Sequence, residues 1–276
     1  MKVIGIGDNV VDKYLHLNKM FPGGNALNFT VYAKQLNTPA SYIGVFGTDK
    51  AGKHVKQVMR QFGIDISHCR TYEGENGYAE VNLEDGDRVF VGSNGGGVSE
   101  QYPLQLSQED LQYIEEHDLI HSSCFSFLEG ELHKLKKLTP PVSYDFSKNY
   151  DDDYLDEVCP YIDYAFLSCG HLTKKETKEK LNEVVEKGCN LAVGTRGVKG
   201  AILLYNDQFY YQEAKKVEPI DTLGAGDSFI TVILLEIIRN PEITEEVIAR
   251  GLKKAAEFAS ETCLVNGAFG HGKTIK

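Results

Sequence analysis

A glycine-rich loop that leads directly into an apolar helix has the clearest chemical potential in this sequence. Residues 221–227 read Asp-Thr-Leu-Gly-Ala-Gly-Asp, and the mostly apolar run 229–235 follows at once. The first backbone N–H groups of a helix lack partners within the helix and lie at the positive end of its dipole. Gly224, Ala225 and Gly226 could therefore bind the negative charge of a phosphoryl group in transfer.

Asp227 stands at the mouth of this nest, where its carboxylate could accept the proton of an attacking hydroxyl group. A general base in this position would complete a site for phosphoryl transfer to an alcohol. The alternative is an aspartate that only caps the helix after a glycine turn. The spacing alone does not separate these two interpretations.

A second group of polar residues lies near the start of the chain. Residues 21–28 read Phe-Pro-Gly-Gly-Asn-Ala-Leu-Asn and form a glycine turn that opens a helix. The glycines let the backbone approach a ligand closely, and the amide of Asn28 offers both donors and acceptors to sugar hydroxyls. Asp8 and Asp12 precede this turn, at the end of the first expected strand. A Gly-Gly-Asn turn is by itself a weak motif.

A third loop, residues 195–200, reads Thr-Arg-Gly-Val-Lys-Gly between two expected strands. Its glycines would let the backbone approach a nucleotide, and the hydroxyl of Thr195 could hydrogen-bond a phosphate oxygen. It is not a Walker loop, because the pattern Gly-x-x-x-x-Gly-Lys-Ser/Thr is absent. The alternative is a glycine hairpin without a ligand.

Taken in this order, the three motifs resemble those of the ribokinase-like, PfkB-type carbohydrate kinases. The resemblance implies a general base and an anion hole, formed by Asp227 and by Gly224, Ala225 and Gly226. It also implies a set of substrate-binding residues, to which we add Asp8: Asp8, Asp12, Gly23, Gly24, Asn25 and Asn28. The expected nucleotide-binding residues are Thr195, Gly197, Gly200 and Asp221.

Within this family, residues 7–14, 17–19, 23–26, 63–68 and 87–90 resemble the fructoselysine 6-kinases. This resemblance implies an ATP-dependent, Mg²⁺-assisted kinase that phosphorylates the 6-hydroxyl of a fructosamine. A fructosamine carries a cationic amine, which Asp8 and Asp12 would favour. A fructokinase, ribokinase or nucleoside kinase of the same family remains an alternative, as does a sugar-binding regulator without turnover. A Rossmann dehydrogenase is disfavoured, because Gly5-x-Gly7 lacks the further glycine of that motif.

Two positions depart from the family pattern. Residues 168–171 read Ser-Cys-Gly-His where many members carry Asn-x-x-Glu, which helps to organise Mg²⁺ and phosphates. No metal ligand is therefore assigned. Leu223 stands where ribokinases often carry threonine, so activation by a monovalent cation is not predicted.

The elements that must position these residues alternate between strands and helices. Such alternation predicts an α/β fold with a mostly parallel sheet and helices on both faces; with the resemblance, this becomes a ribokinase-like three-layer α/β/α sandwich spanning 1–276 as one domain. An Asp-Gly pair between 78–83 and 88–91 predicts a hairpin, and we expect a small β-lid formed from about 12–22 and 78–92. The predicted helices are 26–35, 52–62, 108–116, 174–186, 225–238 and 244–260. The predicted strands of the main sheet are 3–7, 42–47, 119–121, 142–146, 162–167 and 191–194, and a second hairpin is predicted from 201–205 and 208–211.

Composition narrows the range of partners. The 276 residues carry a formal net charge of -11 without a basic run, which argues against nucleic acid and anionic membranes as partners. Six scattered cysteines without metal-ligand spacing favour reduced thiols in a cytoplasmic protein. No apolar run approaches the roughly 20 residues that span a bilayer, and the start of the chain does not resemble an export segment. A small-molecule substrate is expected, and homo-oligomers remain open.

Overall fold

Strand β1 (Val3–Gly7) occupies an inner position in the larger of two sheets that the computed structural model contains. The structure describes residues 1–84 and 87–275, and the side chains of these except 83, 84 and 87–90. In this described part, β1 begins a run of parallel strands that also contains β4 (Ala40–Gly47), β5 (Arg70–Tyr72), β8 (Leu119–Ser123), β9 (Val142–Asp145), β10 (Tyr164–Ser168) and β11 (Leu191–Thr195).

The edge of the sheet beyond β11 is antiparallel. Strands β12 (Ala201–Tyr205) and β13 (Gln208–Gln212) form a hairpin there, as predicted. The order across the described strands is β13-β12-β11-β10-β9-β8-β1-β4-β5. Because the parallel strands all end at one edge, residues that follow β1, β9 and β11 meet at that edge, where ligands bind in open α/β sheets.

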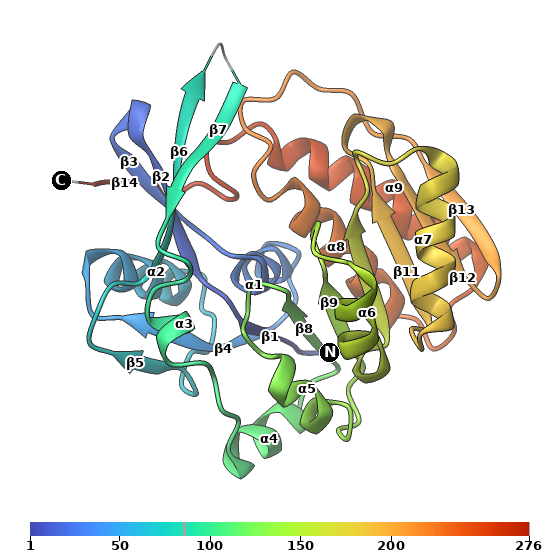
Figure 1. The fold of residues 1–276 in the computed structure, drawn as a ribbon, viewed down its shortest axis with the longest axis horizontal. Helices are drawn as coiled ribbons and strands as arrows, with labels where there is room; N and C mark the ends of the chain where they lie inside the picture. Colours follow the sequence, from blue (N-terminus) through green and yellow to red (C-terminus); the bar gives the residue numbers. More distant parts are fainter. Residues whose placement is uncertain (85–86, 276) are drawn as a thin grey trace.

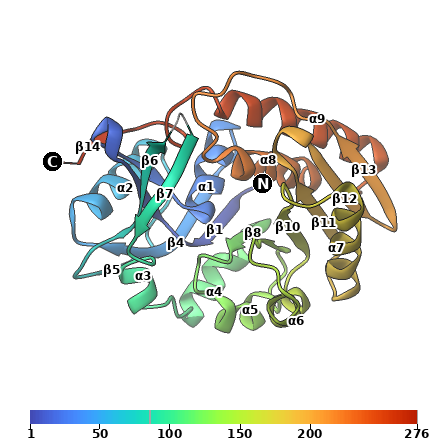
Figure 2. The ribbon, with the colours of Figure 1, turned by 45° about the horizontal axis from the view of Figure 1, so that its top comes forward.

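Helices cover both faces of this sheet (Figure 2). One face packs against apolar side chains of the C-terminal helices, and the other against the helices of the middle of the chain. The first layer holds α1 (Asn25–Gln35), α2 (Lys50–Gln61), α8 (Ala225–Ile238) and α9 (Glu245–Thr262). The second holds α4 (Gln108–Glu115), α5 (Glu129–Leu135), α6 (Asp152–Val158) and α7 (Lys174–Glu186). The predicted three-layer α/β/α fold is confirmed.

Local signals in the sequence place several helix starts. Ser107 and Thr173 each begin a helix with a capping box, in which side chain and backbone bond reciprocally. Thr244 caps α9 through its side chain, so this helix starts one residue later than predicted. None of the helices in the described part of the chain has the length and apolar character that crossing a bilayer requires.

The second sheet stands beside the end of β1 (Figure 1). Its strands in the described residues have the order β14-β3-β2-β6-β7. They are β14 (Lys273–Thr274), β3 (Lys19–Gly23), β2 (Val10–Tyr14), β6 (Gly77–Glu84) and β7 (Asp87–Ser93). The segments expected to form a lid, 12–22 and 78–92, lie largely in these strands, whereas β14 was not predicted. Residues 85–86, the predicted turn, and the side chains of 87–90 lie outside the described residues. The role of this sheet as a lid stays a prediction.

Candidate active site

The carboxylate of Asp8 holds the start of helix α1. Gly24, the N-cap residue, has no side chain and a φ of 112°, so α1 cannot be capped by its own N-cap residue. Asp8 follows β1 and accepts hydrogen bonds from the backbone N–H groups of Asn25 and Ala26, at 2.6 and 3.1 Å. The hydroxyls of Ser123 and Ser126 also donate to it. The buried Asp8 carboxylate thus fixes α1 against the edge of the sheet.

Asn25, the first residue of α1, joins two carboxylates. Its side-chain amide nitrogen donates to Oδ2 of Asp145 at 2.5 Å and to Oδ1 of Asp227 at 2.9 Å. One turn later on the same helix, the amide of Asn28 donates to Oδ2 of Asp227 at 2.5 Å. Both asparagines belong to the predicted substrate-binding set, and the structure brings them into contact with the predicted base.

Asp227 lies in the first turn of α8 and is partly exposed. Burial of its carboxyl group raises its pKa well above the ordinary value, and the hydrogen bond from Asn28 opposes this shift. The negative charges of Asp145, Asp8 and Asp12 raise the pKa further. A carboxylate with a raised pKa and hydrogen bonds that fix its orientation is suited to accept a proton.

Asp145, at the end of β9, is one of the three acidic residues near Asp227, with Asp8 and Asp12. Burial raises the pKa of its carboxyl group to about 6, while hydrogen bonds from the Ser147 backbone and from Asn25 oppose the shift. Asp145 is not among the site residues predicted from the sequence. A signal was present, because it is a carboxylate directly after a buried parallel strand, where ligand sites form.

The loop before α8 adopts the conformation that its glycines allow. Gly224 has a φ of 74°, and a Cβ there would lie 2.3 Å from Oη of Tyr32. A Cβ at Gly226 would meet no heavy atom within 4 Å, so this position faces open space. Ala225 begins α8, whose first N–H groups lack partners within the helix. The turn is thus packed at Gly224, its Ala225 N–H donates to the Thr222 carbonyl oxygen at 3.3 Å, and it is open at Gly226, beside Asp227.

Asp221 is buried and bonded within the protein. Its carboxylate accepts hydrogen bonds from the backbone N–H groups of Leu223 and Gly267, both at 2.8 Å, and from the hydroxyl of Tyr14 at 2.5 Å. Tyr14 belongs to β2 of the second sheet. These contacts place Asp221 as an anchor of the glycine loop. Its predicted contact with nucleotide stays a prediction.

The side chain of Asp12 on β2 reaches diagonally towards Gly23 on β3, whose direct partner in the sheet is Val10. A Cβ on Gly23 would lie 2.4 Å from Oδ2 of Asp12, so only glycine leaves room for this carboxylate. Both residues are buried. On helix α1, the side-chain oxygen of Asn28 is buried and has no hydrogen-bond partner among the described residues. Such a buried acceptor favours a ligand that brings a donor.

The third predicted loop follows β11, at the same edge of the sheet. Gly200 has a φ of 86°, and a Cβ there would lie 1.9 Å from the carbonyl oxygen of Gln212. Gly197 also has a positive φ, 56°, and faces open space. The hydroxyl of Thr195 donates to the carbonyl oxygen of Leu167 at 3.3 Å. This hydroxyl would have to turn before it could donate to a phosphate.

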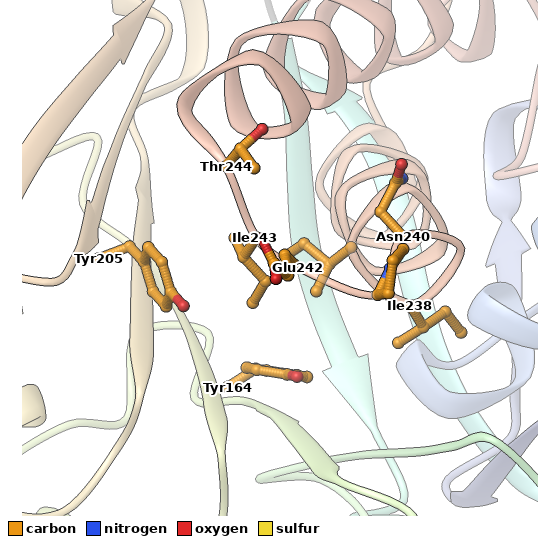
Figure 3. A pocket seen from close by; sticks show the side chains of 9 residues that line it. Tyr164, Tyr205, Ile238, Asn240, Glu242, Ile243 and Thr244 are labelled. Atoms are coloured by element: carbon orange, nitrogen blue, oxygen red, sulfur yellow. The ribbon is translucent and has the colours of Figure 1, made fainter.

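A cavity of about 550 Å³ lies away from these residues, at the other end of α8 (Figure 3). Tyr164 and Tyr205 flank it on one side and Asn240 on another. Helix α8 has 14 residues, which corresponds to about 21 Å of rise, so the cavity is separated from Asp227. It takes no part in the arrangement of carboxylates described above.

A carboxylate beside an open glycine turn, at the carboxyl edge of a three-layer α/β/α fold, defines a class of small-molecule kinases that transfer a phosphoryl group to an alcohol. The chain belongs to the pfkB family of carbohydrate kinases, which it matches over residues 3–268.

Two similar proteins carry specific names. The chain is 45% identical to "Fructosamine kinase FrlD" of Bacillus subtilis (strain 168), over 99% of this chain and 94% of the relative. It is 37% identical to "Fructoselysine 6-kinase" of Escherichia coli (strain K12), over 83% of this chain and 86% of the relative. The fold matches a ribokinase of Arabidopsis thaliana, solved with ribose and ATP, with a TM-score of 0.82 at 19% identity, over 98% of this chain and 94% of the ribokinase.

Proposed function

We propose that this protein transfers the γ-phosphoryl group of ATP to the 6-hydroxyl of a fructosamine such as fructoselysine. The observation that carries the proposal is the 45% identity to a fructosamine kinase across almost the whole chain. The acidic surroundings of the site add independent support, because a fructosamine carries a cationic amine that plain fructose lacks.

In the proposed reaction, Asp227 accepts the proton of the 6-hydroxyl as the hydroxyl oxygen attacks the γ-phosphorus of ATP, whose bond to the β–γ bridging oxygen breaks and releases ADP. The asparagine amides of α1 hold the carboxylate in place, and the open turn at Gly224 to Gly226 receives the charge of the transferring group. Little covalent work falls to the protein in such a transfer, so positioning and electrostatic stabilisation supply most of the catalysis.

The acceptor would bind between α1 and the second sheet. The unpartnered side-chain oxygen of Asn28 would accept a hydrogen bond from a substrate hydroxyl. Asp12 is the carboxylate that we assign to direct substrate contact. Asp8 is already held by two backbone N–H groups and two hydroxyls, so we assign it to positioning Asn25 and to the negative potential of the site.

ATP would lie along the carboxyl edge, from the open turn before α8 towards the loop at Thr195 to Gly200. The open space beside Gly197 and Gly226 fits a close approach by phosphates. The described residues contain no group of three acidic, histidine or cysteine side chains placed to hold a metal ion. We therefore propose that the triphosphate itself supplies most ligands for Mg²⁺, which offsets phosphate charge.

The test compares kcat/KM for fructoselysine, fructose, ribose and a nucleoside by ADP release. A charge-assisted contact to the amine corresponds to roughly ten- to a hundredfold in kcat/KM, so fructoselysine should exceed fructose by that factor. Identification of the phosphorylated carbon by NMR checks the position of transfer. Equal or better use of fructose or ribose would contradict the substrate and leave the kinase activity standing.

A further inference from the structure

We propose that His121 is a positioning residue that fixes the amide of Asn25 and, through it, the protonation of the two carboxylates that Asn25 joins. His121 lies in β8 and is fully buried. Its Nε2 lies 2.9 Å from Oδ1 of Asn25 and its Nδ1 lies 3.0 Å from Oγ of Ser143. The inference rests on the proposed role of Asp227 as the base.

The hydrogen-bond pattern determines the tautomer of His121. Two carboxylates, Asp145 and Asp227, lie within 2.9 Å of the Asn25 side-chain nitrogen, so this atom must be the donating NH₂ group. The other side-chain atom of Asn25 is then the oxygen, which can only accept. His121 must therefore carry its proton on Nε2. Its Nδ1 then accepts from the hydroxyl of Ser143.

Burial keeps this imidazole neutral. With no compensating charge, burial lowers the pKa of His121 to about 3. A neutral ring with one donor and one acceptor matches its two partners, and Phe29 packs against the ring with centroids 4.6 Å apart. The side chain is thus held as a fixed donor across the pH range in which the enzyme would work.

The consequence for Asn25 is a fixed amide plane. An asparagine amide that is bonded at both ends cannot turn over, so its two N–H bonds stay directed at Asp145 and Asp227. Hydrogen bonds to an ionised carboxylate favour the ionised form; the one from Asn25 opposes the rise of the Asp145 pKa. Without His121, the amide would turn more freely and the pKa of both carboxyl groups would rise.

The test uses His121→Leu, which removes the donor at similar volume, and His121→Gln, whose amide nitrogen can replace Nε2–H. Both are assayed with the acceptor that the wild type turns over fastest, so that an error in the substrate proposal does not alter the result. For His121→Leu we expect kcat to fall about tenfold, and the acid limb of the kcat/KM profile to move up by about half a pH unit or more. KM for ATP should not change.

His121→Gln should restore both kcat and the pH profile to within about threefold and a few tenths of a pH unit of the wild type. If His121→Leu does not fold, Ser143→Ala provides the test. It removes the hydroxyl that donates to Nδ1 of His121 and so favours the Nε2–H tautomer less, and it should move the acid limb in the same direction by a smaller amount. A wild-type profile in a folded His121→Leu or Ser143→Ala protein would overturn the proposal. The proposal would also be overturned if His121→Gln lost as much kcat as His121→Leu and showed the same shift of the acid limb. A normal kcat in Asp227→Asn would instead count against the base itself.

Discussion

The carboxylate of Asp227 accepts one hydrogen bond from the side-chain amide of Asn25 and one from that of Asn28, which lies a helical turn later on α1. This arrangement orients both oxygens, and leaves the base dependent on a helix that Asp8 anchors from the end of β1. The orientation of the proposed base therefore depends on Asn25 and Asn28, which contact its carboxylate directly, and on Asp8, which fixes the helix that carries them. For Asn25 and Asn28 the residue type matters, because the NH₂ group of an asparagine side chain can donate two hydrogen bonds.

Replacement of the base isolates its contribution. Asp227→Asn should lower kcat by about 10² to 10⁴-fold, the usual contribution of general-base catalysis. The affinity for ATP, measured by calorimetric titration, should stay within about threefold because the backbone turn is unchanged. Ser228→Ala is the matched control, since among the described residues the hydroxyl of this adjacent residue bonds the Ala225 carbonyl oxygen within the helix. A near-normal kcat in Asp227→Asn would remove the aspartate from the reaction.

Two glycines at the start of helix α8 have different roles: one allows a backbone conformation that other residues rarely adopt, and the other leaves open space for a ligand. Gly224 has a left-handed backbone, and a Cβ on it would lie 2.3 Å from the hydroxyl oxygen of Tyr32. Gly226 has neither restriction. Gly224→Ala should lower both Tm and kcat, with a stability loss of about 1–2 kcal/mol or more.

Gly226→Ala is the paired variant. It should leave Tm unchanged or slightly higher, while kcat falls by about 10²-fold if the phosphoryl group approaches this residue. Thermal unfolding and steady-state kinetics on both proteins check the pair. A Gly224→Ala protein as stable as the wild type would contradict the left-handed turn, and an unimpaired Gly226→Ala would exclude contact with the transferring group.

The sequence predicted most helices and strands because these elements carry local signals, such as the capping box at Ser107. It predicted the turn at Gly23 and the loop at 221–227 for the same reason. It did not reveal β14, a strand of two residues whose pairing depends on β3. His121 was not among the residues selected from the sequence, because its partner Asn25 is 96 residues away and no spacing rule connects them.

The free energy of unfolding of the whole molecule should depend on Asp145. Its pKa is raised from 3.8 to about 6 in the folded protein, so the folded chain binds this proton more tightly than the unfolded chain. Stability contributed by the protonated form is complete below pH 4 and is lost as pH rises through 6. Asp145→Asn should therefore stabilise the protein at pH 7.5, by on the order of 1–2 kcal/mol.

Urea unfolding at pH 7.5 and pH 4 measures this effect, which should shrink or reverse at the lower pH because the wild-type group is then largely protonated. Asp207→Asn, in an exposed turn, controls for the loss of one negative charge. An Asp145→Asn protein that is less stable than the wild type at pH 7.5 would show that the lost hydrogen-bond acceptor outweighs the relief of the buried charge.

The hydrogen bonds that assemble the site also set an order of events during folding. They join Asn25 to partners 96, 120 and 202 positions away. Contacts of such separation close large loops and form late. A chain emerging during synthesis can complete β1 and α1 long before α8 exists, but it lacks Asp227, the proposed base, until α8 docks. If Asp227 is the base, partly folded chains are unable to consume ATP, and turnover begins only when α8 has docked beside α1.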